Sequence, residues 1–542
     1  MADQRDITDR PDLAGAAGRV GPVRTRMPVY VDLLPPCNNA CPAGENIQEY
    51  LRLVKAGQDE LAWRQLTADN PFPAIHGRVC YHPCESMCNR AELDSAISIH
   101  GVERYLGDKA LAEGWQFPLS DQPTGFKVLI VGAGPSGLAA AYHLARLGHT
   151  VEIRDAGDLP GGMMRYGIPE YRLPRDVVDA EIQRIRALGV KITQNHNIKD
   201  LLQEQAEGGF HAVFVAIGAH LSKRVDIPSM DAGRMVDAVS FLRDVASGGR
   251  PSIGRRVAVY GGGNTAMDAA RVARRLGAEE SIVVYRRTED QMPAHAAEKE
   301  AAEAEGVTMN WLRTIQAMES DSVTVEIMEL DESGKARGTG RFEELQADTV
   351  ILALGQEADS HFLRAIPGLQ FDGDVVRVDP KTLMTDVDGI FAGGDAVPSE
   401  RTVTIGVGHG KRAARMIDAY LFNHESPRRT QRPVATLDML NLWYFGDHAR
   451  RMEPELDASV RTEGFDEIVE GLKPEEAHFE AARCLSCGNC IECDGCLGSC
   501  PEDAIIKLGK GYRYRYDYEK CTGCATCFEQ CPVHAIEMIP EH

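Results

Sequence analysis

Ten of the fifteen cysteines in this chain fall in its last sixty residues, and eight of these ten are spaced as iron–sulfur ligands. They form two consecutive sets that each read Cys-x2-Cys-x2-Cys-x3-Cys-Pro, in which three thiolates hold one cluster and the fourth crosses to the other. Disulfides are the alternative, but they do not explain why the same proline-terminated spacing occurs twice. The spacing therefore predicts two 4Fe-4S clusters, one on Cys490, Cys493, Cys496 and Cys531, and one on Cys521, Cys524, Cys527 and Cys500.

A glycine-rich turn predicts a first dinucleotide site. The apolar run 126–131 precedes this turn, a helical stretch follows it, and an acidic residue ends the next predicted strand about twenty residues later. In that context the glycines let the backbone approach a pyrophosphate at a helix N-terminus, and the acid binds ribose hydroxyls. The predicted ligands are Gly132, Gly134, Pro135, Ser136, Gly137 and Asp155.

A second turn of the same kind follows the apolar residues 257–260. Its predicted ligands include an alanine in place of the third glycine, which the motif permits. The next strand, 281–285, ends in two arginines that suit a 2′-phosphate, so NADPH is favoured over NADH. A solvated basic edge is the alternative for these arginines. The candidate residues are Gly261, Gly263, Asn264, Thr265, Ala266, Arg286 and Arg287.

The segment 389–395 resembles the ribityl-binding motif of flavoproteins that carry two dinucleotide-binding domains. Gly394 and Asp395 are therefore predicted FAD ligands, and the second turn is left for the nicotinamide nucleotide. His409 follows this motif and is expected to be structural, and no acid–base residue is assigned. No cysteine lies between Cys88 and Cys484, which excludes a redox-active dithiol beside the flavin. Electrons are thus expected to leave the flavin singly, through iron and sulfur.

The five N-terminal cysteines lie in segments, 37–42, 76–88 and 99–105, that resemble the N-terminal domain of glutamate synthase small subunits and of dihydropyrimidine dehydrogenase. The resemblance continues through motifs at 166–174, 285–287 and 292–294 and covers about residues 30–424. It implies a cluster bound by three cysteines and one carboxylate or amide side chain. Carried onto this sequence, the ligands are Cys41, Cys80, Cys84 and Glu103, although Glu103 is alternatively a surface residue of a helix.

The family's other N-terminal cluster needs a Cys-x-x-Cys pair shortly before the position of Cys37, and residues 30–36 contain none. An Arg-Cys-x-x-Cys sequence of that kind instead occurs at 483–487, just before the C-terminal sets. We therefore predict a cluster shared between the two ends of the chain, which brings the total to four clusters. The alternatives are that these cysteines are free thiols, or that Cys37 and Cys88 form a pair without a metal. The predicted ligands are Cys37, Cys88, Cys484 and Cys487.

The predicted fold class is α/β, with two Rossmann-like dinucleotide-binding domains between a helical iron–sulfur domain and a bacterial-type ferredoxin domain that carries two 4Fe-4S clusters. The apolar segment 440–445 is expected to be packed, or alternatively to be a contact patch for another subunit. The predicted boundaries are a mobile segment at 1–28, the helical domain at 29–121, the FAD domain at 122–221 and 357–424, the NAD(P)H domain at 222–356, a linker at 425–480 and the ferredoxin domain at 481–542.

The composition suits a large soluble enzyme. The 542 residues are 43% hydrophobic and 26% charged, and the net charge of −22 argues against nucleic acid or an anionic membrane as a partner. No long apolar run predicts a membrane helix, and the N-terminus lacks the hydrophobic core of a signal peptide. Cluster thiolates need a reducing compartment, which predicts a cytoplasmic location.

These features predict an FAD-dependent NAD(P)H:iron–sulfur oxidoreductase. The segments leave no room for a substrate-converting domain, so we expect the substrate on a partner subunit, such as that of a 2-oxoacid oxidoreductase, or a soluble ferredoxin as partner. A glutamate synthase small subunit is the second hypothesis, but the extra ferredoxin domain and the missing N-terminal Cys-x-x-Cys disfavour it. A non-enzymatic redox scaffold is the third, and the intact glycine turns disfavour that.

Overall fold

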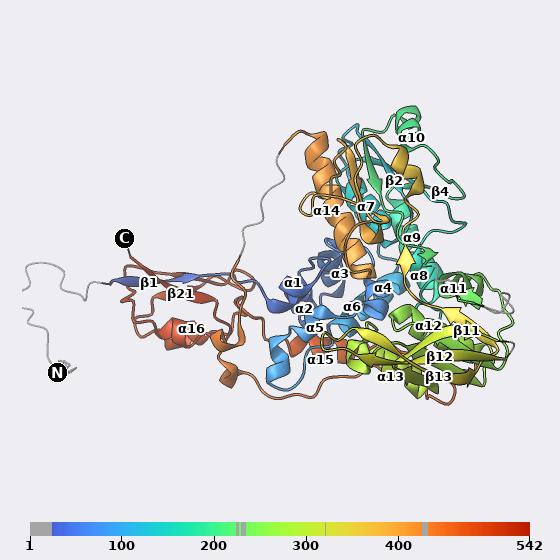
Figure 1. The fold of residues 1–542 in the computed structure, drawn as a ribbon. Helices are drawn as coiled ribbons and strands as arrows, with labels where there is room; N and C mark the ends of the chain where they lie inside the picture. The colour runs from blue at the N-terminus through green and yellow to red at the C-terminus, as the bar shows by residue number, and fades with distance from the viewer. Residues whose placement is uncertain (1–23, 224–226, 229–234, 320, 425–431, 542) are drawn as a thin grey trace, which may run out of the picture.

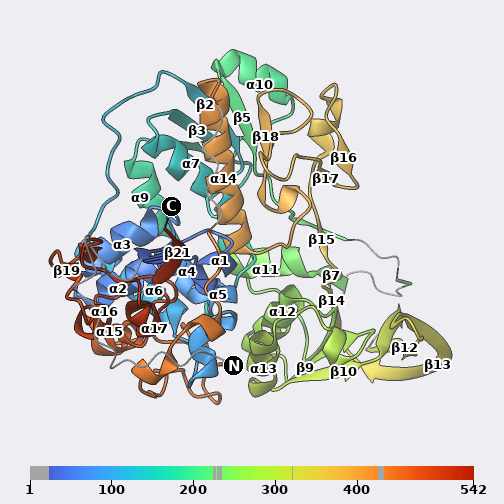
Figure 2. The same cartoon turned by 90° about the vertical axis from the view of Figure 1, so that its left-hand side faces the viewer.

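The computed structural model describes residues 24–541 except 224–226, 229–234, 320 and 425–431. Figure 1 shows a helical domain at the centre, the first dinucleotide domain above it, the second dinucleotide domain at its lower right, and a ferredoxin lobe that projects to the left. Figure 2, turned by 90°, shows the two dinucleotide domains stacked one above the other beside the helical domain. No helix among the described residues is long and apolar enough to cross a membrane.

The first dinucleotide domain is built on a parallel sheet in the order β18-β5-β2-β3-β4. The central strand β2 is buried, as expected for a sheet with helices on both faces. Helices α7 (Pro135–Arg146) and α14 (Val403–Leu421) pack closely against each other beside this sheet. The strands are β2 (Lys127–Val131), β3 (Thr150–Arg154), β4 (Lys191–Thr193), β5 (Ala212–Val215) and β18 (Ile390–Ala392).

The second dinucleotide domain repeats the plan with a parallel sheet in the order β10-β9-β8-β14-β7. Helix α12 (Asn264–Arg275) follows strand β8, and an antiparallel sheet, β11-β12-β13, extends the domain outward. Two short paired strands, β6 (Leu221–Ser222) and β15 (Gln356–Glu357), connect the two domains. They lie where the predicted insertion, 222–356, begins and ends. The remaining strands are β7 (Met235–Asp237), β8 (Arg256–Tyr260), β9 (Glu280–Tyr285), β10 (Val307–Trp311), β11 (Arg313–Met318), β12 (Ser322–Leu330), β13 (Ala336–Gln346) and β14 (Thr349–Leu352).

The helical domain contains six N-terminal helices and one helix from the C-terminal part of the chain. Helix α15 (Pro474–Ala482) packs against α2 and α6, so the predicted domain boundary at 480/481 falls inside a helix. Its end is anchored by Glu480 and Arg483, which form a buried ion pair of 2.7 Å. The N-terminal helices are α1 (Pro36–Ala40), α2 (Ile47–Lys55), α3 (Asp59–Thr67), α4 (Pro73–Val79), α5 (Pro83–Ser86) and α6 (Ile99–Glu113).

The ferredoxin lobe takes one strand from the N-terminus of the chain. Strand β1 (Arg26–Tyr30) pairs antiparallel with β21 (Ile536–Pro540), so residues 26–28, which the sequence placed in a mobile segment, belong to a sheet. That part of the prediction is wrong, and residues 1–23 lie outside the described residues. The rest of the lobe comprises α16 (Gly495–Ser499), α17 (Thr526–Glu529), β19 (Ile505–Lys507) and β20 (Tyr514–Tyr516).

The described part of the predicted linker is packed against other domains. Its residues 453–472, here called the strap, join three domains. Glu467 pairs with Arg78 at 2.8 Å and with Arg104 at 2.9 Å in the helical domain. The backbone N–H of Ile468 donates to the carbonyl of Tyr171 in the first dinucleotide domain, and the Ile468 side chain packs in the core of the second. In the segment 440–445, Leu440 is buried whereas Trp443 is 69% exposed.

Candidate functional site

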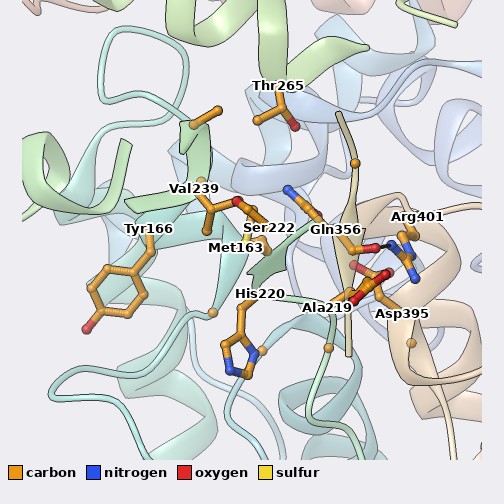
Figure 3. A pocket seen from close by; sticks show the side chains of 18 of the residues that line it. Met163, Tyr166, Ala219, His220, Ser222, Val239, Thr265, Gln356, Asp395 and Arg401 are labelled. Carbon is orange, nitrogen blue, oxygen red and sulfur yellow. Dashed lines mark hydrogen bonds between the residues drawn. The ribbon is translucent and has the colours of Figure 1, made fainter. Parts of the chain in front are cut away.

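One cavity of about 1170 Å³ lies between the two dinucleotide domains and is lined by residues of both glycine turns. A typical small-molecule site has roughly 300–1,000 Å³, so this cavity is larger than most sites for one small ligand. Figure 3 shows Thr265 of the second domain and Asp395 of the first on opposite sides, with Ser222 and Gln356 between them. Both predicted dinucleotide sites therefore open into the same space.

The first turn forms the backbone cradle that the sequence predicts. Gly132 has φ +105°, and a Cβ there would lie 2.4 Å from the carbonyl oxygen of Ala216, so a side chain is excluded. The Asp155 carboxylate accepts hydrogen bonds from the backbone N–H groups of Ala133 at 2.6 Å and Gly157 at 2.7 Å. It thus fixes the turn while also lining the cavity at the N-terminal end of α7. The turn residues fit a dinucleotide pyrophosphate and ribose.

The predicted flavin motif enters the cavity beside this turn. Burial raises the pKa of Asp395 to about 6, and Arg401 opposes the rise. The Gly394 backbone N–H donates to Nδ1 of His409 at 3.1 Å, so His409 fixes the motif, which supports the structural role expected for it. Arg401 also donates to the carbonyl of Gln356 at the domain connection, an interaction drawn in Figure 3. The Asp395 carboxylate lines the cavity and fits a ribityl hydroxyl group as its partner.

The second turn presents cationic groups to the other end of the cavity. Asn264 begins helix α12, and its side-chain oxygen accepts from the backbone N–H of His295 at 2.9 Å. Arg286 and Arg287 both line the cavity. The Nε atom of Arg287 is buried and has no hydrogen-bond partner among the described residues, so a ligand in the cavity could accept from it. This arrangement fits the 2′-phosphate of NADPH.

Three N-terminal cysteines and Glu103 converge in the helical domain. Burial raises the pKa values of Cys41 and Cys84, and each thiol has other members of the set as charged neighbours. Glu103 is only 5% exposed, so it is not a surface residue, and burial raises its pKa well above the ordinary range. Asn70 donates to Glu103 at 2.9 Å and to Glu45 at 2.8 Å. Glu45 thus shares the site, and the sequence did not single it out.

The four cysteines predicted to share a cluster, here called the shared set, also lie close together. More than 390 positions of sequence separate Cys37 and Cys88 from Cys484 and Cys487. Burial raises the pKa of Cys37, and the neighbouring thiols of Cys484, Cys88 and Cys487 raise it further. The side chain of Asn89 donates to Sγ of Cys487 at 3.5 Å, and the N–H of Ser486 donates to Sγ of Cys484 at 3.4 Å. All fifteen cysteines are described, and all are free of disulfides. The four thiols therefore fit a common cluster.

Each ferredoxin set surrounds its own cavity. The set that begins three residues after Cys487, here called the inner set, lines one cavity with Cys490, Cys493, Cys496 and Cys531. The other, here called the outer set, lines the second cavity with Cys500, Cys521, Cys524 and Cys527. In both cavities one cysteine comes from the partner motif, as the crossed-over pattern requires. The described cysteines thus fit two 4Fe-4S clusters in the predicted arrangement.

Helix α14 connects the dinucleotide cavity to Cys41, Cys80 and Cys84, here called the first thiol set. Its N-terminal residues line the cavity, and the hydroxyl of Thr404 in its first turn donates to Sγ of Cys80 at 3.2 Å. A Cβ at Gly408 would lie 2.2 Å from the carbonyl oxygen of Pro42, the residue after Cys41, so the helix and the cysteine loop touch through their backbones. One helix therefore contacts both the nucleotide cavity and a proposed cluster.

Comparison with known families identifies three matching regions. Residues 126–410 match pyridine nucleotide-disulphide oxidoreductases, residues 33–115 match the 4Fe-4S cluster domain II of dihydropyrimidine dehydrogenase, and residues 477–538 match a 4Fe-4S dicluster domain. The first match alone covers more than half of the chain. The chain belongs to the pyridine nucleotide-disulphide oxidoreductase family, and carries iron–sulfur domains at both ends. The predicted fold class and the enzyme class of FAD- and NAD(P)H-dependent oxidoreductase are confirmed.

Individual relatives combine the same parts. The chain is 37% identical to the beta subunit of an NADP(+)-dependent formate dehydrogenase from Moorella thermoacetica, over 83% of this chain and 70% of that protein. It is 34% identical to the beta subunit of an NADPH-Fe(3+) oxidoreductase from Geobacter sulfurreducens, over 83% and 75%. It is 32% identical to the glutamate synthase [NADPH] small chain of Azospirillum brasilense, over 74% and 88%. The predicted resemblance to glutamate synthase small subunits is confirmed.

Iron content tests the shared set. Four clusters predict about 16 iron atoms per chain in protein purified without oxygen. Because Cys484 and Cys487 supply half of the ligands of the shared set, their joint replacement by serine should lower the content to about 12. A content of about 12 in the unaltered protein, unchanged in the variant, would show that this set binds no cluster.

Nucleotide preference tests the two arginines at the second turn. Arg286→Ala/Arg287→Ala should lower kcat/KM for NADPH by about 10- to 100-fold, the loss expected for one or two charge-assisted bonds to a phosphate. The value for NADH should change little, because NADH lacks the 2′-phosphate. Arg255→Ala is the matched control, since Arg255 lies in the same domain and pairs with Glu279 on the surface. Equal losses with both nucleotides would contradict the assignment.

Proposed function

We propose that this chain is the NADPH-handling subunit of a larger redox complex, and that its cysteines form a continuous electron path from the cavity to the surface of the ferredoxin lobe. The contact between Thr404 and Cys80 carries the proposal, because it joins the flavin end of the cavity to the first thiol set. When bound, FAD exchanges two electrons with NADPH, and 4Fe-4S clusters carry electrons singly.

The order of the path follows from neighbouring thiols. Cys84 of the first set has Cys37 of the shared set among its charged neighbours. Cys487 of the shared set is three residues before Cys490 of the inner ferredoxin set. Cys496 of that set is in turn a neighbour of Cys527 in the outer one. The outer set also contains Cys524, the exposed cysteine of the chain, which makes it the exit toward a partner.

The chain's own residues position the two nucleotides rather than transfer protons. Asp155 and Asp395 line one end of the cavity, where they orient ribose and ribityl hydroxyl groups. Arg286 and Arg287 bind phosphate at the other end. Strands β6 and β15 join the two dinucleotide domains, and the strap holds both to the helical domain, which keeps the cavity beside Cys80.

The partner subunit is expected to hold the organic substrate. The relatives from Moorella and Geobacter bear beta-subunit names, which supports a role as one component of a complex. A formate dehydrogenase catalytic subunit is the partner that the first of these relatives favours. A 2-oxoacid oxidoreductase remains the alternative predicted from the sequence, as does a soluble ferredoxin. A glutamate synthase large chain is the second candidate, which the small-chain relative supports over 74% of this chain.

The path is tested by following reduction with NADPH under anaerobic conditions. In Cys484→Ser/Cys487→Ser, the flavin absorbance should bleach as fast as in the unaltered protein, because the cavity and Cys80 are intact. The electron paramagnetic resonance signals of the two ferredoxin clusters should then appear much more slowly. The flavin phase is the internal control. Equally fast reduction of the ferredoxin clusters would rule out a path through the shared set.

The partner is tested by isolating the native protein anaerobically and identifying every stoichiometric companion by mass. A subunit with an organic-substrate site is the expected companion, and its family would decide between a formate dehydrogenase and a 2-oxoacid oxidoreductase. A glutamate synthase large chain would establish the second candidate. Isolation of the chain alone would contradict the multi-subunit proposal and point to a soluble ferredoxin as acceptor.

A further inference from the structure

The strand that the N-terminus lends to the ferredoxin lobe ends beside the inner set of cysteines. The hydroxyl oxygen of Tyr30 lies 3.5 Å from Sγ of Cys496. Tyr30 also lines the cavity that the four inner cysteines surround. Tyr30 is separated from Cys496 by 466 positions of sequence, so this contact exists only because β1 pairs with β21.

The Tyr30 ring is held firmly in place. It stacks on Tyr516 with ring centroids 4.9 Å apart and on Tyr514 at 6.4 Å. Its backbone pairs with Ile536, and the next residue, Val31, donates its N–H to the carbonyl of Ala535 at 3.0 Å. A ring fixed by stacking and by strand pairing holds its hydroxyl oxygen near Sγ of Cys496 with little loss of side-chain entropy.

Chemistry decides which atom donates in this contact. A cysteine that binds a cluster does so as a thiolate, which has no proton and can only accept. A tyrosine hydroxyl keeps its proton at neutral pH and can donate it in a hydrogen bond. Once the cluster is bound, the bond must therefore run from the Tyr30 hydroxyl to the sulfur of Cys496.

We propose that Tyr30 raises the reduction potential of the inner ferredoxin cluster by donating a hydrogen bond to its ligand Cys496. The inference rests on the ligation proposed above for the inner set. Reduction adds one negative charge to the cluster, and a donor at a ligand sulfur stabilises the more negative state. The N-terminal strand would thus favour electron flow from the shared set into the ferredoxin lobe.

Tyr514 provides a matched control within the same stack. Its hydroxyl donates to the Asp494 carboxylate at 2.6 Å and accepts from the Asp494 backbone N–H at 3.0 Å. Tyr514 also lines this cavity, but its hydroxyl is bonded to Asp494 and not to a cysteine. Replacement of either tyrosine by phenylalanine keeps the ring and removes only the hydroxyl.

The experiment is a redox titration of the full-length, anaerobically purified protein, monitored by electron paramagnetic resonance, for the unaltered chain, Tyr30→Phe and Tyr514→Phe. Tyr30→Phe should lower the reduction equilibrium constant of one cluster about tenfold, the size of effect that one hydrogen bond to a charged group supplies. For a one-electron step this equals about 59 mV toward more negative potential. The other clusters, and every cluster in Tyr514→Phe, should keep their potentials.

Three results would overturn the proposal. The potentials could stay unchanged in Tyr30→Phe, they could shift equally in Tyr514→Phe, or Tyr30→Phe could lose iron, which would make the hydroxyl a requirement for assembly. The ligation itself is judged separately from the iron content of the unaltered protein. A low iron content there counts against the proposed clusters, whereas full iron with an unshifted potential counts against Tyr30 alone.

Discussion

The buried ion pair between Glu480 and Arg483 holds the two ends of the chain together at the point where their cysteines meet. Glu480 also accepts from the backbone N–H groups of Ser98 at 2.9 Å and Arg451 at 2.6 Å. Arg483 donates to Asp94 at 2.9 Å, while Arg90 donates to the carbonyl of Arg483. Such further hydrogen bonds help to offset the cost of burying two charges, and loss of one partner of a buried pair costs about 3–5 kcal/mol. The residue after Arg483 is Cys484, so this network places the first thiol of the shared set.

The thiols of the helical domain lie in surroundings that disfavour charge. Burial raises the pKa values of Cys37, Cys41 and Cys84, which disfavours their thiolate forms in the absence of a metal. Each ligand must lose its proton when a cluster is inserted, which couples assembly to proton release and to folding. Glu103 follows the same rule, since it is buried near Glu45 and its pKa is raised. These proposed ligands of the helical domain are therefore groups whose ionised forms are disfavoured without a bound metal.

Local spacing made the strand–turn–helix units and the ferredoxin ligand sets predictable, because each depends on residues close in sequence. The shared set was also predicted, from a family motif displaced from residues 30–36 to 483–487, and the structure brings its thiols together. Strand β1 was missed because Pro28 weakens a strand pattern and its partner is about 510 residues away. Glu45 gave no signal, since a single acid near Cys41 has no diagnostic spacing. The strap has many charges and no periodicity, so its packing against three domains could not be seen without the fold.

The pairing of β1 with β21 constrains the order in which the domains can fold during synthesis. Ribosomes add about 5–20 residues per second, so the N-terminal strand waits about half a minute to two minutes for its partner. The dinucleotide domains need no residue beyond about 424 for their sheets, and they can fold during that interval. The ferredoxin lobe, the proposed exit of the electron path, gains this strand pair only after residues 536–540 have been made. A partly made chain can therefore hold both dinucleotide-binding sheets while its ferredoxin lobe still lacks the β1–β21 pair.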